Sequence, residues 1–285
     1  MRRSSSFQDI FLIIASLLLL FSSAIYSVTS PSELSCYPQF CMEAASNEQT
    51  FSNFKRAPVY TEVLEHVSYE KGQEYLSYVL QQSPEFQEKL NLFRENDLLG
   101  NPYAYSYGAF GTFSPTTLRY IKVASEITKI FGSLNNLHIV EIGGGYGGQC
   151  FILSKLYTFA SYTIIDLPGP LALTKKYLHT LGVENVTFLT PDMISTNQSY
   201  DFAISNYAFS ECNTQVQEDY LNKVLSKSTR GYLTCNYEKV GGIIVLTKSE
   251  LLQKLNEKKI VCKELPEEPS TGNTNYLVVW PSTPS

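Results

Sequence analysis

The sequence predicts an α/β fold in which a parallel, doubly wound sheet follows a helical N-terminal region. From residue 137 onward, apolar segments of strand length alternate with helical segments. Such alternation implies a parallel sheet that binds ligands at the carboxyl ends of its strands. A glycine-rich segment joins the first of these strands to a helix. Near the C-terminus, the stretches 259–265 and 276–280 are separated by prolines and a glycine, which indicates an antiparallel pair.

Length and composition are those of a globular protein. The 285 residues allow one large domain, or one domain with a sizeable addition. Hydrophobic residues make up 44%, which excludes wholesale disorder. The 22 Lys and Arg against 27 Asp and Glu give a net charge of −5, and this mild acidity argues against a nucleic-acid partner. The 20 tyrosines and 16 phenylalanines, beside only 17% charged residues, suggest an extended contact surface.

The first 30 residues contain an apolar run, 10–25, behind Arg2 and Arg3. A run of this length is long for the core of a signal peptide and short for a bilayer span, which needs roughly 20 residues. We expect residues 1–30 to be a signal peptide or a membrane anchor, with a buried core helix as the third interpretation. The protein would then be exported or membrane-associated, and a cytoplasmic location is the alternative. Residues 31–57 are mixed and polar, which predicts a linker.

Residues 58–131 form a predicted helical cap. Apolar residues recur at three- and four-residue steps between 59 and 96, and Pro84 suits the first turn of a second helix within that range. The stretch 103–113 is too rich in glycine and aromatic residues for a helix, so we interpret it as a loop. Ser114 followed by Pro115 is a capped start for a helix that runs to about Phe131.

Residues 132–285 form the predicted sheet domain. Strands are expected before the hairpin over the ranges 137–142, 162–166, 186–189, 202–205 and 231–236. The intervening helices are expected over 147–157, 171–181, 217–226 and 249–256. The six cysteines show no spacing typical of a zinc site, so no metal is expected. Cys36 and Cys41 could pair if the protein is exported.

The most specific motif is the segment 139–148, IVEIGGGYGG, between a predicted strand and a predicted helix. Glycines at such a position let the backbone turn tightly and approach a ligand. Gly143, Gly145 and Gly148 satisfy the spacing of dinucleotide-binding loops. Gly143, Gly145 and Gly147 equally satisfy the pattern of loops that bind S-adenosyl-L-methionine (SAM).

Three acidic residues are candidates for contacts to that ligand. Glu141 precedes the first glycine by two residues and favours SAM, because it could receive the ammonium group. Asp166 closes the second strand, where an acid can bond both ribose hydroxyls of either cofactor. Asp192 follows the third strand, where it could face the adenine amino group or cap a helix.

The segment 205–211, SNYAFSE, follows the fourth strand and would leave the sheet edge beside a bound methyl donor. Methyl transfer to a hydroxyl requires aligned partners and the removal of a proton. Glu211 is the candidate base, with a helix-turn acid as the alternative, and Asn206 is a candidate for orienting substrate or donor. We expect the three histidines, among them His66, to be poorer bases.

Five segments together carry a resemblance: SPTTLRY at 114–120, EIGGGYGG at 141–148, IDLP at 165–168, SNYAFSE at 205–211 and NYLVVW at 275–280. In combination they resemble a family of sugar O-methyltransferases, a branch of the class I SAM-dependent methyltransferases. The resemblance covers roughly 58–281 and implies a Rossmann-like methyltransferase fold with SAM as cofactor. By position, Glu141, Gly143, Gly145 and Gly147 would hold the methionine part and Asp166 the ribose.

The same resemblance gives the aromatic loop 103–113 a role. The faces of Tyr105, Tyr107 and Phe110 suit a sugar ring, and glycines would let the loop close as a lid. Alternatively, these aromatic residues fill the interface between the helical cap and the sheet. Arg119 would bind an acidic group of the substrate or form a surface pair, and Tyr207 would contact the acceptor.

The resulting hypothesis is a SAM-dependent O-methyltransferase that acts on a hydroxyl of a sugar or glycan-like acceptor. The alternative is a non-catalytic, membrane-tethered protein that keeps the fold and binds a glycan. An NAD-dependent oxidoreductase fits less well, because the chain offers no convincing Tyr-x-x-x-Lys or histidine arrangement for that chemistry.

Overall fold

The computed structural model describes residues 30–237 and 243–280. The apolar run 10–25, for which the sequence predicts a signal peptide or a membrane anchor, lies outside the described residues. Among the helices of the described residues, none combines the length and the hydrophobicity that crossing a membrane requires.

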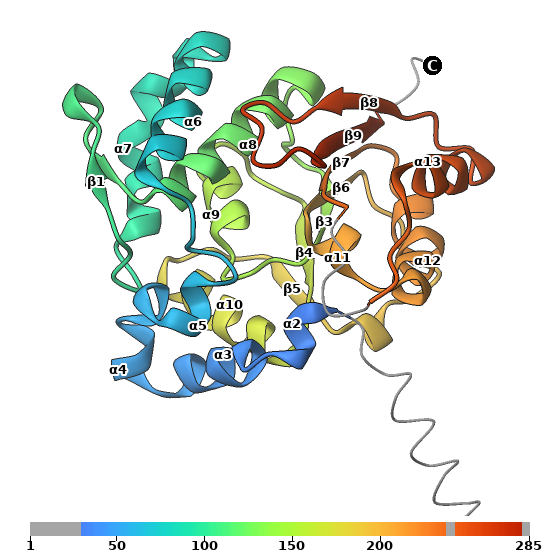
Figure 1. Ribbon diagram of the computed structural model, residues 1–285, viewed down its shortest axis with the longest axis horizontal. Coiled ribbons are helices and arrows are strands. Elements are labelled where there is room, and N and C mark those ends of the chain that lie inside the picture. Colours follow the sequence, from blue (N-terminus) through green and yellow to red (C-terminus); the bar gives the residue numbers. More distant parts are fainter. Residues whose placement is uncertain (1–29, 238–242, 281–285) are drawn as a thin grey trace, which may run out of the picture.

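A seven-stranded sheet runs through the centre of the molecule (Figure 1). Its strands are β3 His138–Ile142, β4 Ser161–Ile165, β5 Val186–Leu189, β6 Phe202–Asn206, β7 Gly231–Cys235, β8 Lys263–Pro266 and β9 Tyr276–Trp280. Their order is β5-β4-β3-β6-β7-β9-β8. The first five pair in parallel, whereas β9 lies antiparallel to both β7 and β8. The predicted fold class, a mostly parallel sheet with an antiparallel C-terminal hairpin, is confirmed.

Helices cover both faces of the sheet, because successive strand residues point to opposite sides. The last helix of the cap is α8 Pro115–Phe131. In the part of the chain that the structure describes, five more helices follow it: α9 Gly148–Ser154, α10 Pro168–Thr180, α11 Ala208–Glu211, α12 Thr214–Lys223 and α13 Lys248–Glu257. Ile139 belongs to the buried cluster formed with α8, α9 and α10. Val140, the next residue, belongs to a second cluster formed with α12 and α13.

Residues 31–57 are not the linker that the sequence predicted. They form α2 Pro31–Leu34, α3 Tyr37–Ser46, α4 Glu48–Phe51 and the 3-10 turn η1 Phe54–Arg56. Tyr37, Cys41 and Ala44 recur at helical spacing and are buried. Helix α3 packs closely on α10: a Cβ on Gly169 would lie only 2.0 Å from the Pro38 carbonyl oxygen. Cys36 and Cys41 are both free thiols, so the pairing considered for them is not formed.

The rest of the cap consists of short elements around one long helix. They are α5 Pro58–Thr61, α6 Tyr69–Gln82, η2 Pro84–Lys89, α7 Leu90–Phe93 and η3 Arg94–Asp97. The second predicted helix is therefore one turn of α-helix between two 3-10 segments. The predicted loop 103–113 contains a small hairpin, in which β1 Tyr105–Ser106 pairs with β2 Thr112–Phe113 around η4 Gly108–Phe110. In Figure 1 this hairpin lies at the outer edge of the cap, beyond α6.

Candidate functional site

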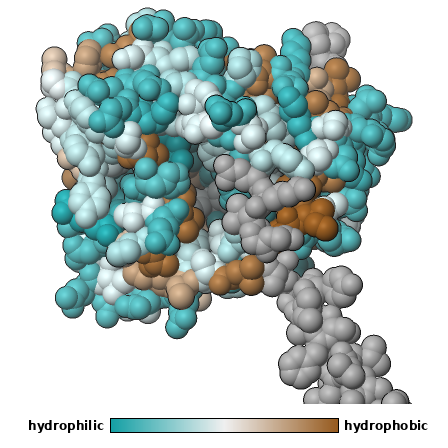
Figure 2. All heavy atoms as spheres, in the orientation of Figure 1, coloured by the Kyte–Doolittle hydropathy of each residue, from teal (hydrophilic) through white to brown (hydrophobic). Residues whose placement is uncertain are grey.

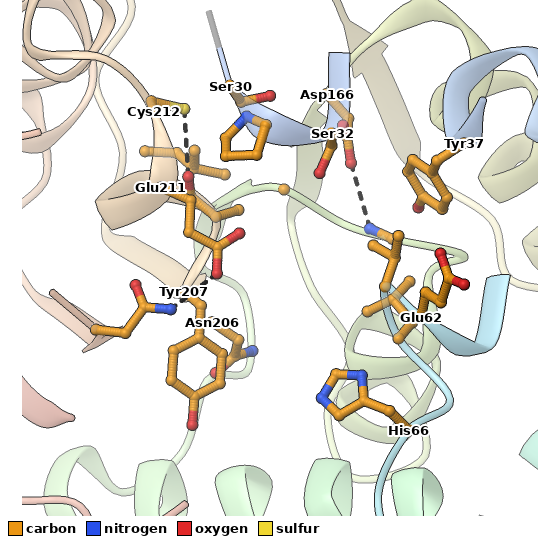
Figure 3. Close-up of a pocket in the computed structure, with 18 of the residues that line it drawn as sticks. Ser30, Ser32, Tyr37, Glu62, His66, Asp166, Asn206, Tyr207, Glu211 and Cys212 are labelled. Atoms are coloured by element: carbon orange, nitrogen blue, oxygen red, sulfur yellow. Dashed lines mark hydrogen bonds between the residues drawn. The ribbon is translucent and has the colours of Figure 1, made fainter. Parts of the chain in front are cut away.

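A cavity of about 780 Å³ opens where the carboxyl ends of β3, β4 and β6 meet. Gly143 and Gly145 line it after β3, Asp166 after β4, and Asn206 and Tyr207 at the end of β6. The face drawn in Figure 2 is hollowed near its centre, and Figure 3 shows side chains from several elements converging on the same space. In parallel sheets of this kind, ligands bind at this edge, and the volume suits a small-molecule site.

The glycine loop after β3 adopts a backbone that other residues resist. Gly143, Gly145 and Gly147 have φ values of 76°, 57° and 93°, all in the left-handed region. A Cβ on Gly143 would lie 2.0 Å from the Cβ of Ala208, so only glycine fits there. Gly147 caps the start of α9 and packs toward Leu178 of α10. Gly143 and Gly145 therefore line the cavity, whereas Gly147 shapes the loop behind it.

Asp166 lies at the carboxyl end of β4, the strand next to this loop, as the sequence predicted. Its Oδ1 accepts a hydrogen bond from the Leu167 N–H at 2.8 Å, and its Oδ2 accepts one from the Gly145 N–H at 3.3 Å. Burial raises the pKa of Asp166 to about 6. The carboxyl thus connects two strand ends and borders the cavity, where it can still accept hydrogen bonds from a ligand.

Glu141 does not lie where the sequence reasoning expected. Its side chain is only 2% exposed and faces the interior, where Oε2 accepts a hydrogen bond from the Tyr162 hydroxyl at 2.8 Å. Burial raises its pKa to about 8. Because strand residues alternate, position 141 points away from the face to which Val140 and Ile142 point. The carboxyl is therefore not brought into the cavity, and a direct contact to a ligand's ammonium group is not supported.

Asp192 also remains outside the cavity. It lies in the 3-10 turn η5 Pro191–Met193 and is exposed, whereas its neighbour Pro191 lines the cavity. Pro191 thus contributes apolar surface at the point where the sequence placed an acidic contact. Within residues 30–237 and 243–280, no group of three His, Cys, Asp or Glu side chains is arranged to hold a metal ion.

The end of β6 places Asn206, Tyr207 and Glu211 around the cavity, as predicted. Tyr207 has a φ of 69°, which is unusual for a bulky residue and is held by its N–H bond to the Thr234 carbonyl at 2.8 Å. Glu211 closes the short helix α11, and its Oε1 accepts a hydrogen bond from the Asn236 amide at 2.9 Å. The left-handed residue turns the chain sharply, so that both side chains border one space.

Sequence reasoning missed two parts of the cavity wall. His66, expected to be a poor base, faces the cavity from the turn between α5 and α6 (Figure 3). Partial desolvation, and to a lesser degree the charge of Arg119, lower the pKa of its imidazole, which favours the neutral ring. The second part is the segment from Ser30 to Tyr37, which borders the cavity beside Asp166. Neither has a local sequence signal, because both depend on how the cap packs against the sheet.

The aromatic hairpin is not a lid over this cavity. Tyr105, Tyr107 and Phe110 are absent from the cavity wall, and Tyr107 is buried beside Tyr69, with 5.3 Å between ring centroids. Phe110 packs against the buried core, and Tyr107 packs against α6 inside the cap. Both rings are therefore packing residues, but Tyr107 does not lie at the predicted interface between cap and sheet. Tyr105 is 42% exposed and borders a separate open groove with Tyr69. The hairpin does not reach the cavity because α6 lies between it and the strand ends.

Comparison with known proteins gives similarity in fold only. No family model and no curated protein matches the chain. A SAM-dependent methyltransferase from Aquifex aeolicus is 19% identical, over 55% of this chain and 88% of its own, with a TM-score of 0.41. An S-adenosylmethionine-dependent methyltransferase from Mesorhizobium loti is 13% identical, over 54% and 94%, with a TM-score of 0.44. An rRNA methylase from Streptococcus thermophilus is 14% identical, over 56% and 93%, with a TM-score of 0.42.

At such identities and TM-scores, these likenesses decide neither cofactor nor acceptor. None of the three names a sugar as its acceptor. The absence of a nucleic-acid partner stays a prediction from net charge alone.

Proposed function

We propose that the protein is a SAM-dependent O-methyltransferase that acts on a hydroxyl of a sugar or glycan-like acceptor. One observation carries the proposal: a single cavity joins a cofactor-type half to an acid–base half. All five of the residues Gly143, Gly145, Asp166, His66 and Glu211 line this one cavity. We assign the first three to the cofactor half and the last two to the acid–base half. A transferase needs both in one space, because the group to be moved and the proton to be removed must meet the same acceptor atom.

The first half fits an adenosine ligand with an amino-acid end. Asp166 offers a carboxyl to ribose hydroxyls, while backbone N–H groups of Gly145 and Leu167 hold it in place. Gly143 places no side chain between the loop and a ligand, and Leu167 and Pro191 supply apolar surface for an adenine ring. When bound, SAM supplies a methyl group on a positively charged sulfur.

In the second half, the acceptor's hydroxyl oxygen forms a bond to the methyl carbon, in line with the carbon–sulfur bond. That bond breaks with its electron pair left on sulfur, and the hydroxyl proton passes to a base. His66 suits this role, because its lowered pKa leaves the imidazole free to accept a proton at pH 7. Glu211, oriented by Asn236, is the other candidate base, and Asn206 can orient the acceptor.

The polar groups around the second half suit a hydroxyl-rich acceptor. Ser68, Asn206, Tyr207 and Asn275 border it with hydroxyl and amide groups, which both donate and accept hydrogen bonds. A sugar hydroxyl needs partners of this kind. The choice of a sugar rests on this lining and on the sequence resemblance to sugar O-methyltransferases.

The proposal is tested by calorimetric titration of the full chain with SAM, S-adenosylhomocysteine (SAH) and NAD. We expect SAM and SAH to bind and NAD to give no heat of binding. Asp166→Ala should weaken SAH binding at least about tenfold, since a charged acceptor of hydrogen bonds is lost. Asp192→Ala, which removes an exposed acid just outside the cavity, is the matched control and should bind as the wild type does. Binding of NAD in place of SAH would overturn the assignment.

A second candidate function, glycan binding without catalysis, has one observation in its favour. The open groove at the hairpin is bordered by Tyr69 and Tyr105, whose ring centroids are 5.5 Å apart, together with Ser68, Glu70 and Ser106. Aromatic faces flanked by polar groups suit a sugar ring. If the protein binds glycans without catalysis, no labelled methyl group should pass from SAM to any acceptor in a cell extract. Tyr105→Ala should then abolish glycan binding. Transfer of label that survives Tyr105→Ala would reject this alternative.

A further inference from the structure

One cationic side chain at the cavity has no anionic partner among the described residues. Arg119, in the second turn of α8, borders both the large cavity and a small pocket beside it. None of the ion pairs formed within the described ranges involves this guanidinium. Its packing partner is an aromatic ring, that of Tyr120, with 5.7 Å between the guanidinium carbon and the ring centroid.

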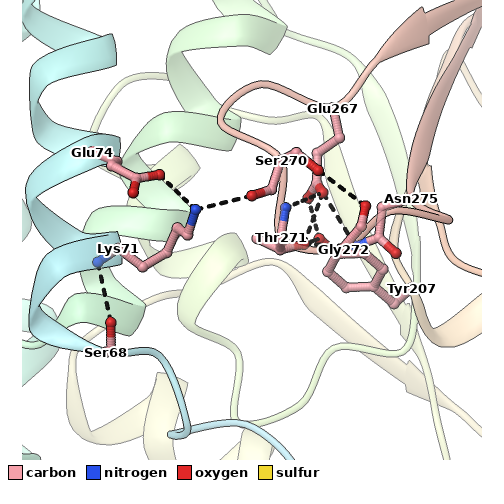
Figure 4. A network of polar contacts seen from close by, with 9 residues as sticks. All are labelled: Ser68, Lys71, Glu74, Tyr207, Glu267, Ser270, Thr271, Gly272 and Asn275. Atoms are coloured by element: carbon pink, nitrogen blue, oxygen red, sulfur yellow. Dashed lines mark hydrogen bonds and ion pairs between the residues drawn. The ribbon is translucent and has the colours of Figure 1, made fainter.

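Two acids and one base that border the same small pocket as Arg119 or interact with its charge are already engaged or neutral. Glu267, across the small pocket, accepts hydrogen bonds from the Tyr207 hydroxyl, from the N–H and hydroxyl of Thr271, and from the Asn275 amide (Figure 4). Glu65 acts on Arg119 only from beyond ion-pair distance, and burial raises its pKa, which favours the uncharged form. His66 is kept neutral by its lowered pKa.

The other cation on this wall, Lys71, is compensated. Its ammonium pairs with Glu74 at 2.5 Å and donates to the Ser270 carbonyl at 2.9 Å, which fastens the loop between β8 and β9 to α6 (Figure 4). Arg119 is thus left with one positive charge facing the cavity. A partly desolvated charge without an anionic partner is unfavourable, whereas a planar guanidinium binds a carboxylate through two parallel hydrogen bonds.

Building on the proposed function, we infer that the acceptor is an acidic sugar of the uronic acid class, and that Arg119 binds its carboxylate. A carboxylate suits one guanidinium better than a phosphate does, because it carries one negative charge and accepts two parallel hydrogen bonds. A phosphate would bring additional negative charge into a cavity whose wall already carries Glu62 and Glu211. The carboxylate is bound but not methylated. The new oxygen–carbon bond forms at a ring hydroxyl, whose proton passes to the base.

The test measures binding of D-glucuronate, D-glucose and D-glucose 6-phosphate to the full chain saturated with SAH. We expect D-glucuronate to bind more tightly than the other two. Arg119→Gln should weaken D-glucuronate binding at least about tenfold and leave D-glucose unchanged, whereas Arg119→Lys should give an intermediate loss, since the charge stays and the paired hydrogen bonds do not. Lys129→Gln, which removes an exposed cation from the end of the same helix, should change nothing.

Equal binding of D-glucuronate and D-glucose by the wild type, or a preference for D-glucose 6-phosphate, would overturn the inference. So would an Arg119→Gln variant that binds SAH normally and D-glucuronate as tightly as the wild type. Because SAH binding is measured first on each variant, it separates a misfolded variant from an informative one. Failure of the wild type to bind SAH would instead refute the proposed function, so the two failures are distinguishable.

Discussion

The hydroxyl of Tyr207 donates a hydrogen bond to the carboxylate of Glu267, 60 positions further along the chain. This bond joins the end of β6, where the acceptor half of the cavity begins, to the loop between β8 and β9. Thr271 and Asn275 donate to the same carboxylate. The antiparallel hairpin at the end of the chain therefore does more than complete the sheet, because its loop holds a side chain of the candidate site.

Tyr207→Phe removes the hydroxyl from this network and keeps the ring. We expect the free energy of unfolding to fall by about 1–3 kcal/mol, because a charged, partly buried acceptor loses one of its donors. Urea denaturation at pH 7 measures the change. Tyr103→Phe, at a tyrosine that is 51% exposed, is the control and should be neutral. Equal stabilities for the two variants would mean that the bond to Glu267 contributes nothing.

Gly143→Ala should disrupt the glycine loop. The new Cβ would lie 2.0 Å from that of Ala208, in a backbone conformation that side chains resist. We expect SAH binding to weaken at least about tenfold and stability to fall by more than the roughly 1 kcal/mol that a left-handed alanine costs by itself. Gly182→Ala provides that reference, because Gly182 has a φ of 70° and no atom within 4 Å of the added carbon. If both variants lose the same stability and bind SAH alike, the close approach of Ala208 has no consequence.

Glu141→Gln should remove a pH dependence of stability. The folded pKa of Glu141 is about 8, above its ordinary 4.5, so the folded state holds a proton that the unfolded state releases. Stability of the wild type therefore falls as pH rises between these values, with a slope of up to about 1.4 kcal/mol per pH unit. Between pH 7 and 8, above the pKa of about 6 at Asp166, the variant should lack this slope. Parallel stability curves for wild type and variant would show that the carboxyl ionises normally.

Two variants distinguish the candidate bases. His66→Gln and Glu211→Gln should both bind SAH as the wild type does, and the variant that lacks the base should lower kcat by about 10²–10⁴-fold. If His66 is the base, kcat of the wild type rises with pH through a pKa below 6.5 and is level by neutral pH, because burial lowers the pKa of this imidazole. A full pH profile retained by His66→Gln would remove it from the mechanism.

Sequence periodicity predicted the sheet well, because its strands are short apolar runs closed by turns. The glycine loop and Asp166 were also predictable, since glycines between a strand end and a helix start are typical of loops that approach a nucleotide. The inward orientation of Glu141 follows from the same alternation, because a residue between Val140 and Ile142 in a strand must face the opposite side.

Other features depend on contacts between distant segments. Residues 31–57 lack the long apolar stripe of an ordinary core helix, and their burial depends on packing against α10. His66 enters the cavity because a turn between two helices meets the strand ends, and the hairpin is kept away by α6. Arg119 was predictable as a candidate, but its lack of an anionic partner within the described ranges appears only once Lys71, Glu267 and Glu65 are placed.

The central claim, methyl transfer to a hydroxyl in this cavity, is tested most directly by incubating the full chain with methyl-labelled SAM and D-glucuronate. We expect the wild type to form labelled O-methyl glucuronate, and Arg119→Gln to reduce its formation at least about tenfold. If the wild type binds SAH yet transfers no label to D-glucuronate or to any other sugar supplied, the claim is contradicted.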